Sequence, residues 1–210
     1  MQPKLQMDKQ LNSDSSIEQL KDKIKLLVRH AAEDRVRKHS DQAGFKLVDV
    51  DGYKTGQVLG NWMSLILITG SPLKITLKLH FSHKNIKQLI FPLYRANSPE
   101  GISDQQSMDF IKELCNLTAG YIEQAFEQKN ISLGISLPLG TRGFYEIFAD
   151  YTPATKPIIK YDDLWCLNFE DLNILGSVMF EVSDIQALEN FMSYDITEDE
   201  DSDEGEFDFL

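Results

Sequence analysis

The chain has 210 residues, 42% of them hydrophobic, which is enough for one sizeable core and marginal for two. Its formal net charge of −12 is concentrated near the end, because residues 195–210 hold nine Asp and Glu and no basic residue. Residues 1–194 carry only −3, which excludes the strongly basic surface of a general nucleic-acid binder.

The sequence lacks the features of a membrane-inserted or secreted protein. No apolar run approaches the roughly 20 residues that span a bilayer, and the first 16 residues contain no signal-peptide-like stretch. Cys115 and Cys166 fit neither a disulfide framework nor a metal-ligand spacing, so we expect two buried, reduced thiols. We therefore expect a soluble, cytoplasmic protein.

One domain is predicted over residues 16–194, between a flexible arm (residues 1–15) and a disordered acidic tail (residues 195–210). Its first helix is expected to begin after Ser15 or Ser16, either of which can cap it. Apolar residues then recur at spacings of three and four: Ile17, Leu20, Ile24, Leu27, Val28 and Ala31. The opposite, Lys- and Arg-rich face fits a solvated surface or, alternatively, docking to an acidic partner.

A β-rich segment follows at residues 56–81. Two strand-like runs flank a Gly-Ser-Pro turn at residues 70–72, which predicts a β-hairpin. Residues 82–96 predict a short helix that ends near Pro92, followed by a polar loop at residues 97–106.

The second half of the chain predicts a long helix and further strands. The helix is expected over residues 108–128, and a last short helix over residues 184–194. Four strand-like segments lie between them: 131–140, 143–151, 163–171 and 174–183. This order of elements predicts an α+β fold, with an antiparallel sheet covered by helices.

One side of the 108–128 helix carries Asp109, Glu113, Asn116 and Gly120 within an arc of roughly 60°. Apolar residues occupy the opposite arc, so we expect this side to face solvent or a partner. Asn is a mediocre helix former, and Gly costs about 1 kcal/mol relative to Ala in a helix interior. Two unfavourable residues on one face indicate close approach of a partner, whereas an ordinary solvated face is the alternative interpretation.

These residues resemble a known signature. Asp109-x3-Glu113-x2-Asn116, with Pro138 downstream, resembles the motif of the CheC, CheX and FliY phosphatases of bacterial chemotaxis. In this chain 21 residues separate Asn116 from Pro138, one fewer than in the family pattern. Glu-x2-Asn alone is weak evidence because it occurs three times, but only this copy has the preceding Asp and the following Gly and Pro. The resemblance covers roughly residues 17–194.

The resemblance implies a CheC/CheX-like fold, closest to CheX because the first helix contains no second motif. It implies a phosphatase that hydrolyses the aspartyl phosphate of a phosphorylated CheY-type response regulator. Asn116 would position the attacking water and Glu113 would bind a lysine of the partner, while Asp109 and Gly120 would contribute to docking. Mg²⁺ would belong to the partner, so no cofactor or metal is expected in this chain. A homodimer is also implied.

A second function stays open: a CheX-like module that binds a response regulator without hydrolysing its phosphate. The chain has no P-loop, nucleophile elbow or dinucleotide fingerprint, which disfavours a self-contained hydrolase or nucleotide-binding enzyme. Pro138 is expected at a strand edge or bulge. His80 and His83 form a weak ligand set, so surface histidines are expected there.

The acidic tail ends in Phe207, Phe209 and Leu210. Its charge predicts a solubilising segment, whereas aromatic residues alternating with acids also fit a segment that folds onto a partner or onto the first helix. Both interpretations remain open from the sequence.

Overall fold

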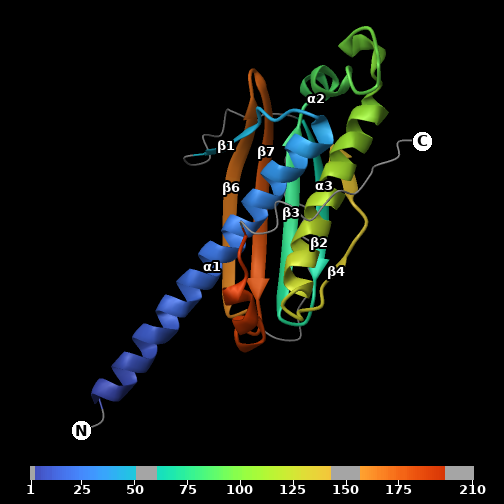
Figure 1. Ribbon diagram of the computed structural model, residues 1–210. Coiled ribbons are helices and arrows are strands. Elements are labelled where there is room, and N and C mark those ends of the chain that lie inside the picture. Colours follow the sequence, from blue (N-terminus) through green and yellow to red (C-terminus); the bar gives the residue numbers. More distant parts are fainter. Residues whose placement is uncertain (1–2, 51–60, 143–156, 197–210) are drawn as a thin grey trace.

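The computed structural model describes residues 3–50, 61–142 and 157–196, with side chains from residue 15 onward. Two long helices, α1 and α3, lie across one face of a β-sheet (Figure 1). The elements in chain order are α1 (Pro3–Ser40), β1 (Lys46–Asp49), β2 (Trp62–Thr69), β3 (Leu73–Phe81), α2 (His83–Ile90), the 3₁₀ helix η1 (Pro99–Gly101), α3 (Asp104–Glu127), β4 (Gly134–Ile135), β5 (Leu139–Arg142), β6 (Ile159–Phe169), β7 (Leu172–Val182) and the 3₁₀ helix η2 (Gln186–Ser193).

The sheet is antiparallel throughout its described pairings. Its strand order is β1-β6-β7-β3-β2-β4, and β5 also pairs with β2. The predicted hairpin is formed by β2 and β3, with Trp62 opposite Phe81. A second hairpin joins β6 and β7, with Ile159 opposite Val182. The predicted α+β class, an antiparallel sheet covered by helices, is therefore confirmed.

Helix α1 begins at Pro3, well before the start predicted at Ser15 or Ser16. Helix α1 therefore extends into the segment predicted as an arm, residues 1–15. Good helix formers dominate the segment KLQMDKQL, and a proline is tolerated in a first helical turn. The predicted apolar stripe does face the protein, since its residues from Leu20 onward are buried: Leu20, Ile24, Leu27, Val28 and Ala31.

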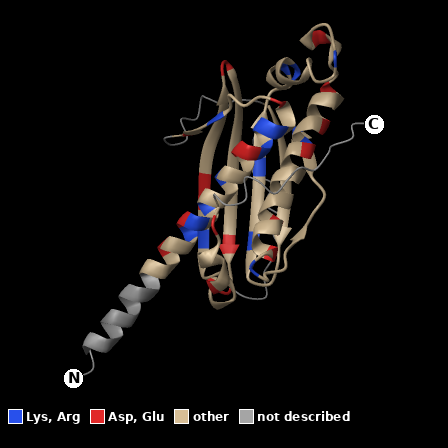
Figure 2. Ribbon diagram, in the orientation of Figure 1, with Lys and Arg blue, Asp and Glu red and all other residues tan. Residues whose placement is uncertain are grey.

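The basic residues of α1 are largely engaged within the chain. Lys and Arg alternate with acidic residues where α1 crosses the sheet (Figure 2). Arg29 forms a two-pronged ion pair with Asp163 of β6, with Nε–Oδ2 and Nη2–Oδ1 distances of 2.6 and 2.8 Å. Arg37 pairs with Glu33 one helical turn away. Much of the positive charge predicted to be solvated or to bind a partner is therefore neutralised internally.

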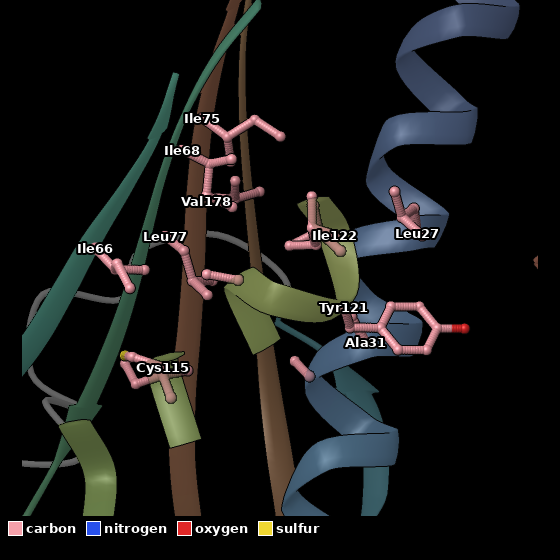
Figure 3. Packing of buried hydrophobic residues seen from close by; sticks show 14 of the residues in the cluster. Leu27, Ala31, Ile66, Ile68, Ile75, Leu77, Cys115, Tyr121, Ile122 and Val178 are labelled. Atoms are coloured by element: carbon pink, nitrogen blue, oxygen red, sulfur yellow. The ribbon is translucent and has the colours of Figure 1, made fainter. Parts of the chain in front are cut away.

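The hydrophobic core lies between the two helices and the sheet (Figure 3). In Figure 3, Leu27 of α1 and Ile122 of α3 lie on the helix side of this core, and Ile68 and Val178 lie on the neighbouring strands. Alternate residues of a strand point to opposite faces, so one face of β2, β3 and β7 supplies this layer. The core holds α3 in one fixed rotation, which determines which of its residues reach the surface.

The later segments agree with the predictions in part. Residues 131–140 form β4 and the start of β5, separated by a break, while 163–171 and 174–183 lie mainly in β6 and β7. The last helix is a 3₁₀ helix. The predicted strand at 143–151 and the tail from residue 197 lie outside the described residues. Within the described part of the chain, no helix combines the length and apolarity required to cross a bilayer.

Candidate functional site

Helix α3 begins at Asp104, four residues before the predicted start. Ser103 caps it: the Ser103 hydroxyl accepts a hydrogen bond from the Gln106 amide, and the Gln106 side chain accepts one from the Ser103 amide. This reciprocal capping box satisfies donors that a helix start leaves unpaired. The polar composition of residues 103–106 predicts a continuation of the preceding loop, although Ser-x2-Gln is itself a helix-start signal. The predicted helix end at Gln128 is within one residue of the observed end.

The buried side of α3 agrees closely with the predicted apolar arc. Ile111, Leu114 and Ile122 are fully buried, whereas Leu117 is only partly covered. Thr118 is also buried, and its hydroxyl donates to the Leu114 carbonyl at 2.7 Å. The helix therefore packs against the sheet and α1 along this side, and its opposite side is left to the surface.

The structure places the four predicted site residues on that surface. Asp109, Glu113 and Asn116 are exposed, and Gly120 is partly exposed one turn beyond Asn116. Asp109 accepts a hydrogen bond from the Gln105 amide group at 2.7 Å. Within the described residues, neither Glu113 nor Asn116 forms a hydrogen bond or ion pair with the protein. Their side chains are therefore available to an incoming molecule, while their functional roles stay predictions.

Gly120 has no packing reason to be glycine. A methyl group placed on its α-carbon would meet no atom within 4 Å, apart from the backbone of its own helix. In contrast, a methyl group on Gly176 would lie 2.3 Å from the Trp165 ring, so glycine is required there by close packing. The folded chain itself thus gives no explanation for a helix-weakening residue at position 120.

Pro138 lies just before the edge strand β5, as expected for a proline at a strand edge or bulge. It also lines a cavity of about 370 Å³ beside α3. The other lining residues come from β2, α2, α3 and β5: Trp62, His83, Asp104, Gln105, Met108, Lys112, Leu139 and Gly140. The downstream proline of the motif is therefore brought beside the motif helix by the pairing of β5 with β2.

Sequence reasoning missed this cavity and its aromatic residues. Trp62 and His83 are 21 positions apart, yet their ring centroids lie 4.7 Å from each other. His83 Nδ1 is hydrogen-bonded to the Ser107 hydroxyl of α3. No local sequence signal joins these residues, because their proximity depends on how α2 and α3 pack at the end of the sheet.

The prediction of two surface histidines is wrong for His80, which is only 3% exposed. It lies on the face of β3 opposite the helices, where its Nε2 is 3.4 Å from the Ser177 hydroxyl. Burial, with a smaller effect from Lys78, lowers the pKa of His80 to about 4. Burial also lowers the pKa of His83, which is partly covered at the cavity. The two rings thus occupy separate environments.

His80 makes the stability of the protein dependent on pH. The unfolded imidazole takes up a proton below about pH 6.5, whereas the folded one stays neutral down to about pH 4. Stability is therefore complete above pH 6.5 and falls as the pH drops toward 4. Between pH 7 and pH 5 we expect His80 to account for a loss of about 2 kcal/mol in unfolding free energy, from about 1.4 kcal/mol per unit.

Urea unfolding of wild type and His80→Gln at both pH values measures this contribution. The wild type is expected to lose more stability between pH 7 and pH 5 than the variant, by about 2 kcal/mol. Equal losses in the two proteins would contradict a neutral buried His80.

The two cysteines are buried and reduced, as predicted. Burial raises the pKa of the Cys115 thiol to about 12, and its Sγ lies 3.8 Å from the Ser64 carbonyl oxygen. Burial also raises the pKa of Cys166. Both thiols are thus poor nucleophiles at neutral pH. In the described parts of the chain, no group of three or more His, Cys, Asp or Glu side chains is arranged to hold a metal ion.

Solved structures with the same architecture identify the fold. A CheC-like superfamily protein from Shewanella sp. PV-4 is similar over 76% of this chain and 97% of its own, with a TM-score of 0.59 and 15% identity. The CheX chemotaxis protein from Vibrio vulnificus is similar over 72% and 91%, with a TM-score of 0.53 and 11% identity. The chain has a CheC/CheX-type fold.

A further structure with this fold is a complex of CheX with CheY, BeF₃ and Mg²⁺ from Borrelia burgdorferi. It matches 75% of this chain and 96% of its own, with a TM-score of 0.53 and 13% identity. No protein-family profile and no curated protein sequence matches the chain. The CheC/CheX-type fold is therefore recognised through three-dimensional structure, and the predicted resemblance is confirmed at that level.

Proposed function

We propose that this chain is a phosphatase for the aspartyl phosphate of a CheY-type response regulator. The observation that carries the proposal is the surface of α3: Asn116 and Glu113 are exposed and pair with none of the described residues, and Gly120 lies beside them with open space around it. The Borrelia complex, in which CheX is bound to CheY with BeF₃ and Mg²⁺, supports this choice of partner.

In the proposed reaction, water attacks phosphorus in line with the bond to the aspartate oxygen. The new oxygen–phosphorus bond forms as that bond breaks, releasing inorganic phosphate and the free carboxylate. The Asn116 carboxamide is neutral and has both donor and acceptor atoms, so it can orient the water without an added charge. Glu113, three residues earlier and on the same helix face, pairs with a lysine of the partner.

The Mg²⁺ of this reaction binds to the response regulator, where it neutralises charge on the transferring phosphoryl group. No metal ligand in this chain takes part. Asp109 is held by Gln105 and contributes to docking rather than to the chemical step. Homodimerisation and a cytoplasmic location stay predictions.

The direct test is the decay rate of phosphorylated CheY-type response regulators from the same organism, with and without the wild-type protein. Acceleration in the presence of Mg²⁺ is expected for at least one regulator. Binding of the phosphorylated regulator without faster decay would overturn the phosphatase proposal and identify a docking module instead. If no regulator of the set is bound and none is dephosphorylated faster, both functions are excluded.

Gly120→Ala is expected to change the stability of the protein and its binding to a regulator in opposite directions. Alanine removes the helix penalty of glycine, and its methyl group meets no other described residue, so we expect unfolding free energy to rise by about 0.5–1 kcal/mol. The same methyl group occupies space needed by the docked regulator, so binding is expected to weaken. Thermal unfolding and a binding titration measure the two effects. Gln19→Ala, on the exposed surface of α1, is the control for binding.

A more stable variant with unchanged binding would show that nothing approaches Gly120 closely. A less stable variant would contradict the open surroundings of this position.

A further inference from the structure

The cavity beside α3 has a lining that is partly apolar and partly polar. The Trp62 and His83 rings meet at an interplanar angle of 57°, and the hydrogen bond to Ser107 fixes the His83 ring. Burial lowers the pKa of His83, which favours the neutral form of its imidazole. Met108 and Leu139 contribute aliphatic surface. Its volume of about 370 Å³ lies in the range of roughly 300–1,000 Å³ typical of ligand pockets, so it can admit a large side chain.

The rim of this cavity offers an unpaired positive charge. Asp104 is already bound to Lys87, with an Oδ1–Nζ distance of 2.6 Å. Lys112 forms no ion pair with any described residue, and it is the single basic residue of α3 beside five acidic ones. The apolar side chains of this lining, next to an ammonium group that pairs with no described residue, are suited to an apolar side chain that has a carboxylate beside it.

The cavity is continuous with the proposed catalytic surface. Lys112 precedes Asn116 by one helical turn, a separation of about 5–6 Å between β-carbons. A specific protein interface covers roughly 800 Å² of each partner, a patch about 30 Å across. A protein centred on Asn116 therefore also covers the cavity.

We infer that this cavity receives an apolar side chain of the docked response regulator, while Lys112 pairs with an acidic group beside that side chain. The inference rests on the proposed function. It adds a contact between the cavity and the regulator, and this contact would favour some regulators over others. A side chain buried in a preformed pocket near the centre of an interface carries a large share of binding energy. The cavity thus acts on affinity, whereas Asn116 acts on the chemical step.

Two matched substitutions test the cavity. Leu139 lines it and is 51% exposed, whereas Leu137 is 89% exposed and does not line it. Leu139→Glu places a carboxylate in the cavity, where it also competes for Lys112. Leu137→Glu makes the same chemical change two residues away. Thermal unfolding confirms that both variants fold.

The primary readout is the dissociation constant for BeF₃-activated response regulators from the same organism. Leu139→Glu is expected to raise it about tenfold or more, and Leu137→Glu to leave it within about twofold of wild type. For a regulator that is dephosphorylated, the KM is expected to rise in parallel while kcat is retained. Lys112→Met is expected to weaken binding and to reduce its dependence on salt.

Tryptophan fluorescence reports on the cavity directly. The chain has two tryptophans, and Trp165 is fully buried in the core, so a binding-induced change in emission is expected to come from Trp62. Trp62→Phe is expected to abolish that change after subtraction of the regulator's own signal.

The outcomes distinguish this inference from the proposed activity. If wild type binds a regulator without accelerating dephosphorylation, the activity is wrong, and the dissociation constants still test the cavity. If Leu139→Glu and Leu137→Glu bind equally, whether at the wild-type level or both weakly, the cavity inference is overturned even if phosphatase activity is present.

Discussion

Asn116→Ala is expected to slow the dephosphorylation of a response regulator about 100-fold at saturation, equivalent to about 3 kcal/mol of transition-state stabilisation. In the proposed mechanism the carboxamide orients the attacking water, and alanine has neither a donor nor an acceptor to replace it. The measurement is single-turnover loss of the phosphoryl group with the phosphatase in excess. Binding of the BeF₃-activated regulator is expected to change little.

Asn116→Asp is the sharper control because it retains the size of the side chain. Its carboxylate can still accept a hydrogen bond from water, but it places a negative charge beside the phosphoryl group. We expect it to be nearly as slow as the alanine variant. Glu113→Gln, in contrast, is expected to weaken binding because a neutral amide cannot form the ion pair with the partner's lysine. Wild-type rates in Asn116→Ala would overturn the assigned role of this residue.

The second large effect concerns the ion pair between α1 and β6. The side chains of Asp163 and Arg29 are only 7% and 12% exposed, and two short hydrogen bonds join them. Arg29 also pairs with Asp49 of β1, so a single guanidinium links α1 to two strands. Asp163→Ala leaves a mostly buried cation without its main partner, which is expected to cost about 3 kcal/mol or more of unfolding free energy.

Chemical denaturation of Asp163→Ala measures this cost. Glu18→Ala is the control, because Glu18 pairs with Lys21 at the surface and its loss is expected to cost at most about 0.5 kcal/mol. The double replacement Arg29→Met with Asp163→Leu removes both buried charges and is expected to recover much of the stability. Equal effects of Asp163→Ala and Glu18→Ala would show that the buried pair contributes no more than a surface pair.

The most predictable part of the structure was the surface of α3. Its helical period is local, so the apolar residues alone determine that Asp109, Glu113 and Asn116 point outward. The predicted start of α3 is four residues too late, because residues 103–106 are polar and typical of a loop. The spacing of Ser103 and Gln106 is nevertheless that of a capping box. Capping signals and hydrophobic periodicity together predict the observed start of α3.

Features that depend on distant parts of the chain were not predictable in this way. β1 has only four residues, mostly exposed, and exists because it pairs with β6 more than a hundred residues later. His80 is predicted at the surface because it forms only a weak ligand set with His83, yet its face of β3 is buried at Thr76, Lys78 and His80. The cavity needs the packing of α2, α3 and β5 together, and no sequence period encodes that packing.

The unpartnered state of Asn116 also bears on how such a protein evolves. Its side chain forms no interaction with the described residues, so folding constrains its identity only through helix propensity. Under the proposed mechanism, a substitution there removes activity while leaving the core and the sheet intact. An enzyme and a pure adaptor with this fold would then differ at one exposed helical position, and either could arise from the other without an unstable intermediate.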